Sequence, residues 1–351
     1  MSARGRTAEG SDEPQGAQGA RAAIDRPGEG TGAELGRRLR EGERSAAPAA
    51  LNLIEDRSPA GREAAAALLA EVSPAALGDE AGAHLVGVTG PPGAGKSSLL
   101  SALVAAWRES GRTVAVLAVD PSSKRSGGSL LGDRARIEHD PGDDGVLIRS
   151  TAAAGRLGGL AAATRAAAQA LAAAFDVVVV ETVGVGQSET EVEELCDTVA
   201  VVVQPGSGDT LQFLKAGIME VPDLLVVTKA DLGKVARAAR RDLAAALSSL
   251  GVSETPVLSV SSVPPPEGIA ELAAAIDQHR GRLDLPAVRA RARRLAALSE
   301  FATEHGERAV RAVGGRRAAE RTLGELDPAL ETAALVSLLD RTAREADGER
   351  Y

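Results

Sequence analysis

The sequence predicts an α/β fold in which helices flank a mostly parallel central sheet, with helical extensions at both ends of the chain. Three observations carry this prediction. Across residues 85–280, short apolar segments rich in β-branched residues alternate with stretches of helical spacing, which is typical of a parallel sheet covered on both faces. The first apolar segment runs directly into a glycine-rich loop. Beyond residue 283 the chain consists of charged, amphipathic segments without such strands.

The length and composition of the chain exclude several classes of protein. The chain has 351 residues, of which 44% are hydrophobic, enough for one sizeable α/β domain with helical additions. Cys196 is the only cysteine and there are four histidines, which excludes an internal disulfide and a cysteine-based zinc site. A net charge of -9 argues against nucleic acid or an anionic membrane as the main partner. With no membrane-spanning stretch and no signal peptide in the sequence, we expect a cytoplasmic protein.

The first part of the chain is predicted to contain a leader and a small helical subdomain. Residues 1–32 are rich in Gly, Ala, Arg and acidic residues without apolar periodicity, which indicates a disordered leader. Helical patterning begins near Ala33, and residues 47–72 have apolar side chains at helical spacing, interrupted at Ser58-Pro59. We therefore expect an N-terminal helical subdomain over residues 33–82.

A central domain is predicted over residues 83–282. Its candidate strands are short and mostly apolar, and they comprise residues 85–88, 113–119, 145–149, 176–181, 198–203, 223–228 and 256–260. A run of three prolines, residues 264–266, breaks the chain after the last strand, and a short helix is expected over residues 269–276.

The final region, residues 283–351, reads as a helical appendage with a dimerisation or partner-docking role. Arginines are frequent between Arg280 and Arg321. The simplest interpretation is that they lie on solvated faces of alanine-rich helices, and the alternative is that some contact an acidic partner surface.

The glycine-rich loop has the full G-x-x-x-x-G-K-S pattern of a P-loop and predicts a nucleotide-binding protein. The glycines let backbone N–H groups surround a β-phosphate, Lys96 reaches the β- and γ-phosphate oxygens, and the Ser97 hydroxyl is placed for Mg²⁺. The predicted phosphate-binding residues are Gly90, Pro91, Pro92, Gly93, Ala94, Gly95, Lys96, Ser97 and Ser98.

Hard oxygen ligands for Mg²⁺ are predicted at the same edge of the sheet. Asp120 closes the second strand, and Asp133 lies in the glycine-containing segment that follows. Mg²⁺ bound to a nucleotide favours one or two carboxylates, a P-loop hydroxyl and waters. The alternatives are a turn carboxylate for Asp120 and a helix N-cap for Asp133.

A third acidic residue, Glu181, ends the apolar strand at residues 176–181 and is followed by a loop containing Gly184 and Gln187. P-loop enzymes place the Walker B acid here, and small G proteins have D-x-x-G, whose glycine amide senses the γ-phosphate. We expect Glu181 to bind or orient the Mg²⁺ shell. Gln187 is a candidate for positioning the attacking water, with a cap or surface role as the alternative.

The segment Thr228-Lys229-Ala230-Asp231 indicates which base the bound nucleotide carries. In G proteins a strand ends in N-K-x-D, in which the Asp accepts hydrogen bonds from guanine, the Lys stem lies along the base and the Asn braces loops. Thr228 replaces the Asn here, so guanine preference is expected with weaker bracing. A later loop, Ser261-Ser262-Val263, lies where backbone N–H groups would contact guanine O6.

These motifs resemble the MeaB/ArgK family of G proteins, the methylmalonyl-CoA mutase-associated GTPases. The resemblance covers roughly residues 47–280, and its most specific string is Glu181-Thr182-Val183-Gly184-Val185-Gly186-Gln187-Ser188-Glu189. Residues 86–97, 117–123, 127–134 and 215–220 carry the remaining similarity.

The resemblance implies a P-loop GTPase that acts as a G-protein chaperone for a cobalamin-dependent acyl-CoA mutase. GTP hydrolysis would gate delivery and protection of the mutase's cobalamin, in a homodimer assembled through C-terminal helices. Three acids would surround Mg²⁺, matching Asp120, Asp133 and Glu181. A loop resembling residues 205–215 would signal to the mutase, with Asp209, Gln212 and Lys215 as its working residues. These three could also be ordinary polar residues at a helix start.

Three other functional classes are alternatives to the one that this resemblance implies. A P-loop kinase of a small molecule would use arginines such as Arg125 and Arg156, but it leaves the Thr-Lys-Ala-Asp segment unexplained. A nickel-insertion G protein would be expected to carry a histidine-rich tract or paired Cys and His residues. A targeting GTPase of the signal-recognition type would need a methionine-lined groove, and the chain has two methionines.

Overall fold

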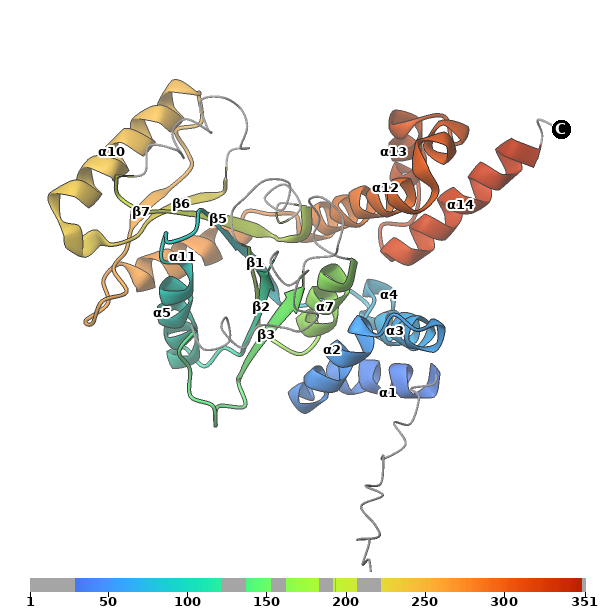
Figure 1. Ribbon diagram of the computed structural model, residues 1–351, viewed down its shortest axis with the longest axis horizontal. Coiled ribbons are helices and arrows are strands. Elements are labelled where there is room, and N and C mark those ends of the chain that lie inside the picture. The colour runs from blue at the N-terminus through green and yellow to red at the C-terminus, as the bar shows by residue number, and fades with distance from the viewer. Residues whose placement is uncertain are drawn as a thin grey trace, which may run out of the picture.

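The computed structural model describes residues 29–120, 137–152, 162–182, 192, 194–206 and 222–348. Figure 1 shows a sheet with helices on both sides and a group of C-terminal helices beyond it. Most of the predicted leader, residues 1–28, lies outside the described residues.

The N-terminal helices pack against one another and against the domain that follows. The first helix, α1 (Glu29–Arg40), begins four residues before the helical patterning expected from Ala33. Within this first turn, Gly32 lets α1 approach α3 closely, because a Cβ there would lie 1.9 Å from the carbonyl oxygen of Ala64. The other elements of this region are η1 (Arg44–Ala46), α2 (Ala47–Glu55), α3 (Pro59–Glu71) and α4 (Pro74–Leu77).

The central sheet confirms the predicted fold class. All seven predicted strands are present, every neighbouring pair is parallel, and the order is β3-β2-β4-β1-β5-β6-β7. Because β1 lies between β4 and β5, the loop that follows it sits at the middle of the carboxyl edge of the sheet. The strands are β1 (His84–Thr89), β2 (Val114–Asp120), β3 (Val146–Ala152), β4 (Val177–Glu181), β5 (Thr198–Val203), β6 (Leu224–Val227) and β7 (Val257–Ser259).

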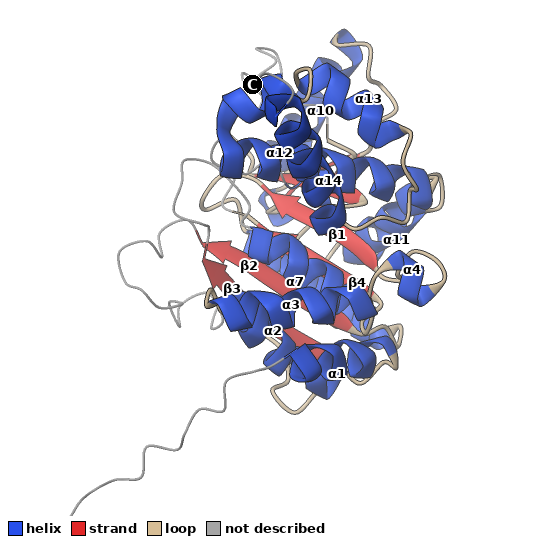
Figure 2. Ribbon diagram, turned by 90° about the vertical axis from the view of Figure 1, so that its right-hand side faces the viewer, coloured by secondary structure: helices blue, strands red, loops and turns tan. Residues whose placement is uncertain are grey.

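Two hydrophobic cores cover the two faces of the sheet. Alternate strand residues point into each core, as Ala115 and Leu117 do on one face and Val114 and Val116 on the other. One core is closed by α5 (Lys96–Glu109) and α11 (Ile269–Arg280). The other is closed by α2, α3, α7 (Ala162–Ala172) and α10 (Lys234–Ser249), and Figure 2 looks onto α7 and α3 over this face.

The C-terminal helices have a hydrophobic core of their own. They are α12 (Leu285–Ala312), which is interrupted by a non-helical Gly306, α13 (Arg316–Gly324) and α14 (Thr332–Gly348). Phe301 and Leu323 are buried at the centre of this third core. The predicted helical character of the region after residue 283 is therefore observed. No helix in the described part of the chain is long and apolar enough to cross a membrane.

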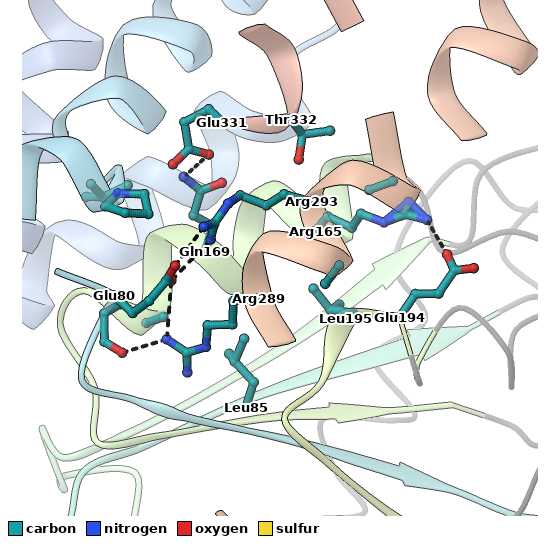
Figure 3. A pocket seen from close by; sticks show the side chains of 16 residues that line it. Glu80, Leu85, Arg165, Gln169, Glu194, Leu195, Arg289, Arg293, Glu331 and Thr332 are labelled. Atoms are coloured by element: carbon teal, nitrogen blue, oxygen red, sulfur yellow. Dashed lines mark hydrogen bonds and ion pairs between the residues drawn. The ribbon is translucent and has the colours of Figure 1, made fainter. Parts of the chain in front are cut away.

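An arginine on α12 anchors these helices to the amino edge of the sheet. Buried Arg289 forms two hydrogen bonds with Asp197, at 2.8 and 2.6 Å, and donates to the carbonyl oxygens of Ala81 and Ala83. One turn further on, Arg293 forms an ion pair with Glu80 at 2.6 Å. Glu80, Arg289 and Arg293 line a cavity of about 100 Å³ at the junction of α7, α12 and the start of α14 (Figure 3).

Candidate nucleotide-binding site

The glycine-rich loop connects β1 to α5 at the carboxyl edge of the sheet. Gly90 has φ 141°, and a Cβ there would lie 2.1 Å from the carbonyl oxygen of Val202 on β5, so only glycine fits. Gly93 and Gly95 also have positive φ, at 77° and 90°. The loop thus curls tightly and turns its backbone into the amino end of α5, the geometry that binds phosphate in proteins.

The first two residues of α5, Lys96 and Ser97, hydrogen-bond to different parts of the structure. The buried Lys96 amine donates hydrogen bonds to the carbonyl oxygens of Gly90, at 2.6 Å, and Pro91, at 3.2 Å. The Ser97 hydroxyl donates to Oε1 of Glu181 at 3.3 Å. The structure therefore brings together the predicted P-loop hydroxyl and the predicted Walker B acid, which are 84 residues apart in the sequence.

A cavity of about 400 Å³ opens at this loop. Its walls come from the loop and from the ends of two neighbouring strands, β2 and β4. The lining residues are Pro92, Gly93, Gly95, Lys96, Ser97, Ser98, Ala118, Val119, Glu181 and Thr182. Thr182, just after β4, is fixed by a 2.9 Å hydrogen bond between its hydroxyl and that of Thr89.

The predicted Mg²⁺ ligands are described in part. Ser97 and Glu181 supply adjacent hydroxyl and carboxylate oxygens, a donor set that suits a hard cation. Asp120 ends β2, two residues after Ala118, which is paired in register with Glu181, so its backbone lies at the same edge. Asp133 lies outside the described residues, and among those described no group of three or more His, Cys, Asp or Glu residues gathers as a metal site.

Thr228, which stands where the usual motif has an Asn, hydrogen-bonds to the glycine-rich loop. Its hydroxyl donates to the carbonyl oxygen of Ala94 in the glycine-rich loop at 2.6 Å and lies 3.1 Å from the carbonyl oxygen of Val203. The side chain is buried, so this hydrogen bond is not in competition with water. A single hydroxyl thus links the segment predicted to contact the base to the glycine-rich loop.

Lys229 and Asp231 are each held by a residue from another strand or loop. The Lys229 amine donates to Oε1 of Gln204, just past β5, at 2.7 Å, and lies 3.5 Å from the carbonyl oxygen of Gly93. The Ser261 hydroxyl donates to Oδ1 of Asp231 at 2.9 Å. Sequence reasoning missed Gln204, although a polar side chain at the carboxyl end of an apolar strand was an available signal.

The loop predicted to contact guanine O6 is shaped by its own hydrogen bonds. The Ser261 N–H donates to the carbonyl oxygen of Glu267, and the Val263 N–H donates to the Ser261 hydroxyl. These contacts leave the N–H of Ser262 as the candidate donor to the base. The loop lies beside Asp231 because the Ala230 N–H donates to the carbonyl oxygen of Val260 at 3.0 Å.

Several predicted residues lie outside the described part of the chain. They are Asp133 and Gln187, with Gly184, and the three residues of the predicted partner loop, Asp209, Gln212 and Lys215. The backbone of Asp120 is described and its side chain is not. Their roles stay predictions.

Comparison with known proteins places the site in context. A family model described as methylmalonyl Co-A mutase-associated GTPase MeaB matches residues 47–314. A probable GTPase of Mycobacterium tuberculosis is 44% identical over 249 residues, covering 69% of this chain and 73% of that protein. GTPase ArgK of Escherichia coli is 45% identical over 207 residues, covering 58% and 60%. The crystal structure of a LAO/AO transport system kinase has a TM-score of 0.60 at 29% identity, covering 90% of this chain and 98% of that one.

Proposed function

Because the chain belongs to the methylmalonyl-CoA mutase-associated GTPase family, we propose that its GTP hydrolysis serves a cobalamin-dependent acyl-CoA mutase of the methylmalonyl-CoA mutase type. The chain is a GTPase, as the family and its named relatives are. It would act as a G-protein chaperone that gates delivery of cobalamin to the mutase and protects the cofactor there. Cobalamin would be bound by the mutase and reach this protein only through that partner.

The observation that carries the proposal is the linkage of three motifs at one sheet edge. The P-loop hydroxyl of Ser97 contacts Glu181, and the P-loop carbonyl of Ala94 is bonded to Thr228, which adjoins the base-reading Lys229. Through these contacts, a change in the bound nucleotide at the glycine-rich loop would be felt both at Glu181 and in the segment that contacts the base, as in a switch protein.

We assign the residues of the site as follows. Lys96 would neutralise charge on the β- and γ-phosphates, and its buried position strengthens that interaction. Asp231, oriented by Ser261, would accept hydrogen bonds from guanine, which adenine cannot supply. Gln187 would orient the attacking water. Asp209, Gln212 and Lys215 would transmit the state of the nucleotide to the mutase.

Mg²⁺ fits the oxygen donors that the described residues offer. Ser97 and Glu181 would hold it, together with Asp120 and Asp133, and the ion would supply positive charge to the phosphate oxygens. We further propose a cytoplasmic homodimer, with residues 33–82 as a helical subdomain, 83–282 as the GTPase domain and 283–351 as the dimerisation region.

The proposal predicts slow hydrolysis by the isolated protein. No arginine is among the residues that line the cavity within the described part of the chain, and arginine fingers supplied by partners accelerate GTPases by ~10³–10⁵. The test is turnover of GTP and of ATP, each with and without a cobalamin-dependent acyl-CoA mutase. We expect GTP to be preferred and the mutase to change its turnover. Equal use of the two nucleotides would contradict the guanine assignment and favour a kinase-like activity.

The matched variant is Lys96→Ala, with Lys234→Ala as control. Lys96 is buried in the loop, whereas Lys234 is exposed at the start of α10. We expect Lys96→Ala to abolish hydrolysis while its thermal unfolding remains cooperative, and Lys234→Ala to hydrolyse GTP at the wild-type rate. Wild-type turnover by Lys96→Ala would refute the site.

A further inference from the structure

Gln204 holds the side chain of Lys229 in place. It follows the last residue of β5 and is half-buried. Its Oε1 accepts a hydrogen bond from the Lys229 ammonium at 2.7 Å, whereas the carbonyl oxygen of Gly93 lies 3.5 Å from the same nitrogen. The Gln204 contact is therefore the stronger of the two, since its length lies in the usual N–H···O range of about 2.7–3.2 Å and that of the Gly93 contact does not.

The backbone of Lys229 is fixed from both sides in an unfavourable conformation. With φ 55° and ψ 43°, it has the single positive φ among the non-glycine residues that the structure describes. This conformation is disfavoured for residues with a Cβ, so neighbouring contacts must hold it. Thr228 donates its N–H to the carbonyl oxygen of Val203 at 2.9 Å, and Ala230 donates to that of Val260 at 3.0 Å.

The side chain of Lys229, by contrast, is exposed and has four rotatable bonds. A lysine side chain of this kind loses much rotamer freedom when it is ordered, so a free Lys229 would bear that cost each time a base is bound. An acceptor that fixes the ammonium in advance removes the cost. The amide oxygen of Gln204 is such an acceptor.

We propose that Gln204 is a positioning residue for guanine nucleotides, acting by pre-ordering the stem of Lys229 beside Asp231. The inference rests on the proposed role of Lys229 and Asp231 at the base. It adds a residue from β5 to the base site, outside the Thr-Lys-Ala-Asp motif. We expect the effect mainly on the base side of the nucleotide, because Gln204 contacts the Lys229 ammonium at 2.7 Å. The carbonyl oxygen of Gly93, in the glycine-rich loop, lies further from that ammonium, at 3.5 Å.

An effect mainly on the base side predicts weaker nucleotide binding with little change in the rate of hydrolysis. Loss of the Gln204 acceptor raises the Kd for GDP and the KM for GTP by about five- to tenfold, the size expected for one typical solvent-accessible hydrogen bond, and leaves kcat within twofold of wild type. Binding of inorganic tripolyphosphate, which has no base, stays unchanged.

The experiment compares Gln204→Leu, Gln204→Glu and the control Gln278→Leu, which changes an exposed glutamine on α11. Gln204→Leu keeps the size of the side chain and removes the acceptor, whereas Gln204→Glu keeps an acceptor for the ammonium. The readouts are the GDP Kd by calorimetry, KM and kcat for GTP, and the inhibition constant of tripolyphosphate. We expect weaker GDP binding in Gln204→Leu and near-wild-type GDP binding in Gln204→Glu and in the control. The inhibition constant of tripolyphosphate is expected to be the same in wild type and in all three variants.

Two results would overturn the inference. One is wild-type GDP affinity in Gln204→Leu; the other is an equal loss of GDP and tripolyphosphate binding, which would indicate damage to the loop instead. Failure of the underlying base assignment looks different, because the wild-type protein itself would then bind ADP as tightly as GDP.

Discussion

The hydroxyl of Thr228 donates a 2.6 Å hydrogen bond to the carbonyl oxygen of Ala94, which joins the segment proposed to contact the base to the glycine-rich loop proposed to bind phosphate. The two residues are 134 positions apart, and both are buried. Thr228, which replaces the usual Asn, therefore makes with a single hydroxyl the loop-to-loop contact that we propose as its bracing role.

Replacement of Thr228 by Val is expected to weaken nucleotide binding. Val has the same shape but leaves the Ala94 carbonyl without its partner, which costs about 1–3 kcal/mol. We expect the GDP Kd to rise about tenfold in Thr228→Val and to return to near wild type in Thr228→Ser. Thr255→Val is the control, because Thr255 makes a longer, 3.4 Å bond to the Pro222 carbonyl oxygen. Unchanged GDP affinity in Thr228→Val would contradict the bracing role.

Removal of Arg289 is expected to destabilise the fold strongly. Its partner Asp197 is buried and also accepts the Leu85 N–H, so Arg289→Met leaves an unpaired charge at the amino edge of the sheet. Breaking one side of a buried ion pair costs about 3–5 kcal/mol, whereas replacing both partners is far less harmful.

Urea unfolding provides the measurement for the Arg289–Asp197 pair. We expect a large fall in midpoint for Arg289→Met, partial recovery in the double variant Arg289→Met with Asp197→Asn, and no change in the exposed control Arg282→Met. A midpoint for Arg289→Met equal to that of wild type would show that the anchor contributes nothing.

His84 is expected to make stability fall in acid. Burial lowers its pKa from 6.5 to about 4, while Nε2 stays hydrogen-bonded to the Thr198 hydroxyl at 2.8 Å. Between these two pH values the unfolded chain binds the extra proton, so the free energy of unfolding decreases as pH falls from 6.5 toward 4, by about 3 kcal/mol for this group.

The check is unfolding followed from pH 7 to pH 4 in wild type and in His84→Gln. We expect the variant to lose stability less steeply over this interval. His139→Gln, which alters an exposed histidine, serves as control and retains the wild-type slope. Parallel curves for wild type and His84→Gln would rule out the burial effect.

Glu331 has the opposite pH dependence. Burial raises its pKa from 4.5 to about 7, and Gln169 donates to its Oε2 at 2.8 Å beside the cavity in Figure 3. The folded protein therefore holds a proton that the unfolded chain releases, and this stabilisation, complete below pH 4.5, is lost as pH rises toward 7. The Glu331→Gln variant is uncharged at every pH.

We expect Glu331→Gln to match wild type near pH 4 and to exceed it in unfolding midpoint at pH 8, where the wild-type carboxylate is charged and buried. Exposed Glu345→Gln is the control and follows wild type at both pH values. A lower midpoint than wild type for Glu331→Gln at pH 8 would contradict the prediction.

The fold class and the position of the site followed from the sequence because both depend on local patterns. Apolar, β-branched segments predicted all seven strands, and the residues at their carboxyl ends predicted which edge carries Lys96, Glu181 and Asp231. Boundaries were less accurate, as at α1, which begins at Glu29 and packs Gly32 against Ala64.

Only the tertiary structure showed the side-chain contacts that bring these motifs together into one site. The order of the strands, with β1 between β4 and β5, brings Ser97 to Glu181, and the alignment of β5 with β6 brings Gln204 to Lys229. Arg289, 92 residues from Asp197, gave no signal among the other arginines of the C-terminal region. Periodicity records whether a residue faces a core, whereas the pairing of polar side chains depends on which elements the whole fold places side by side.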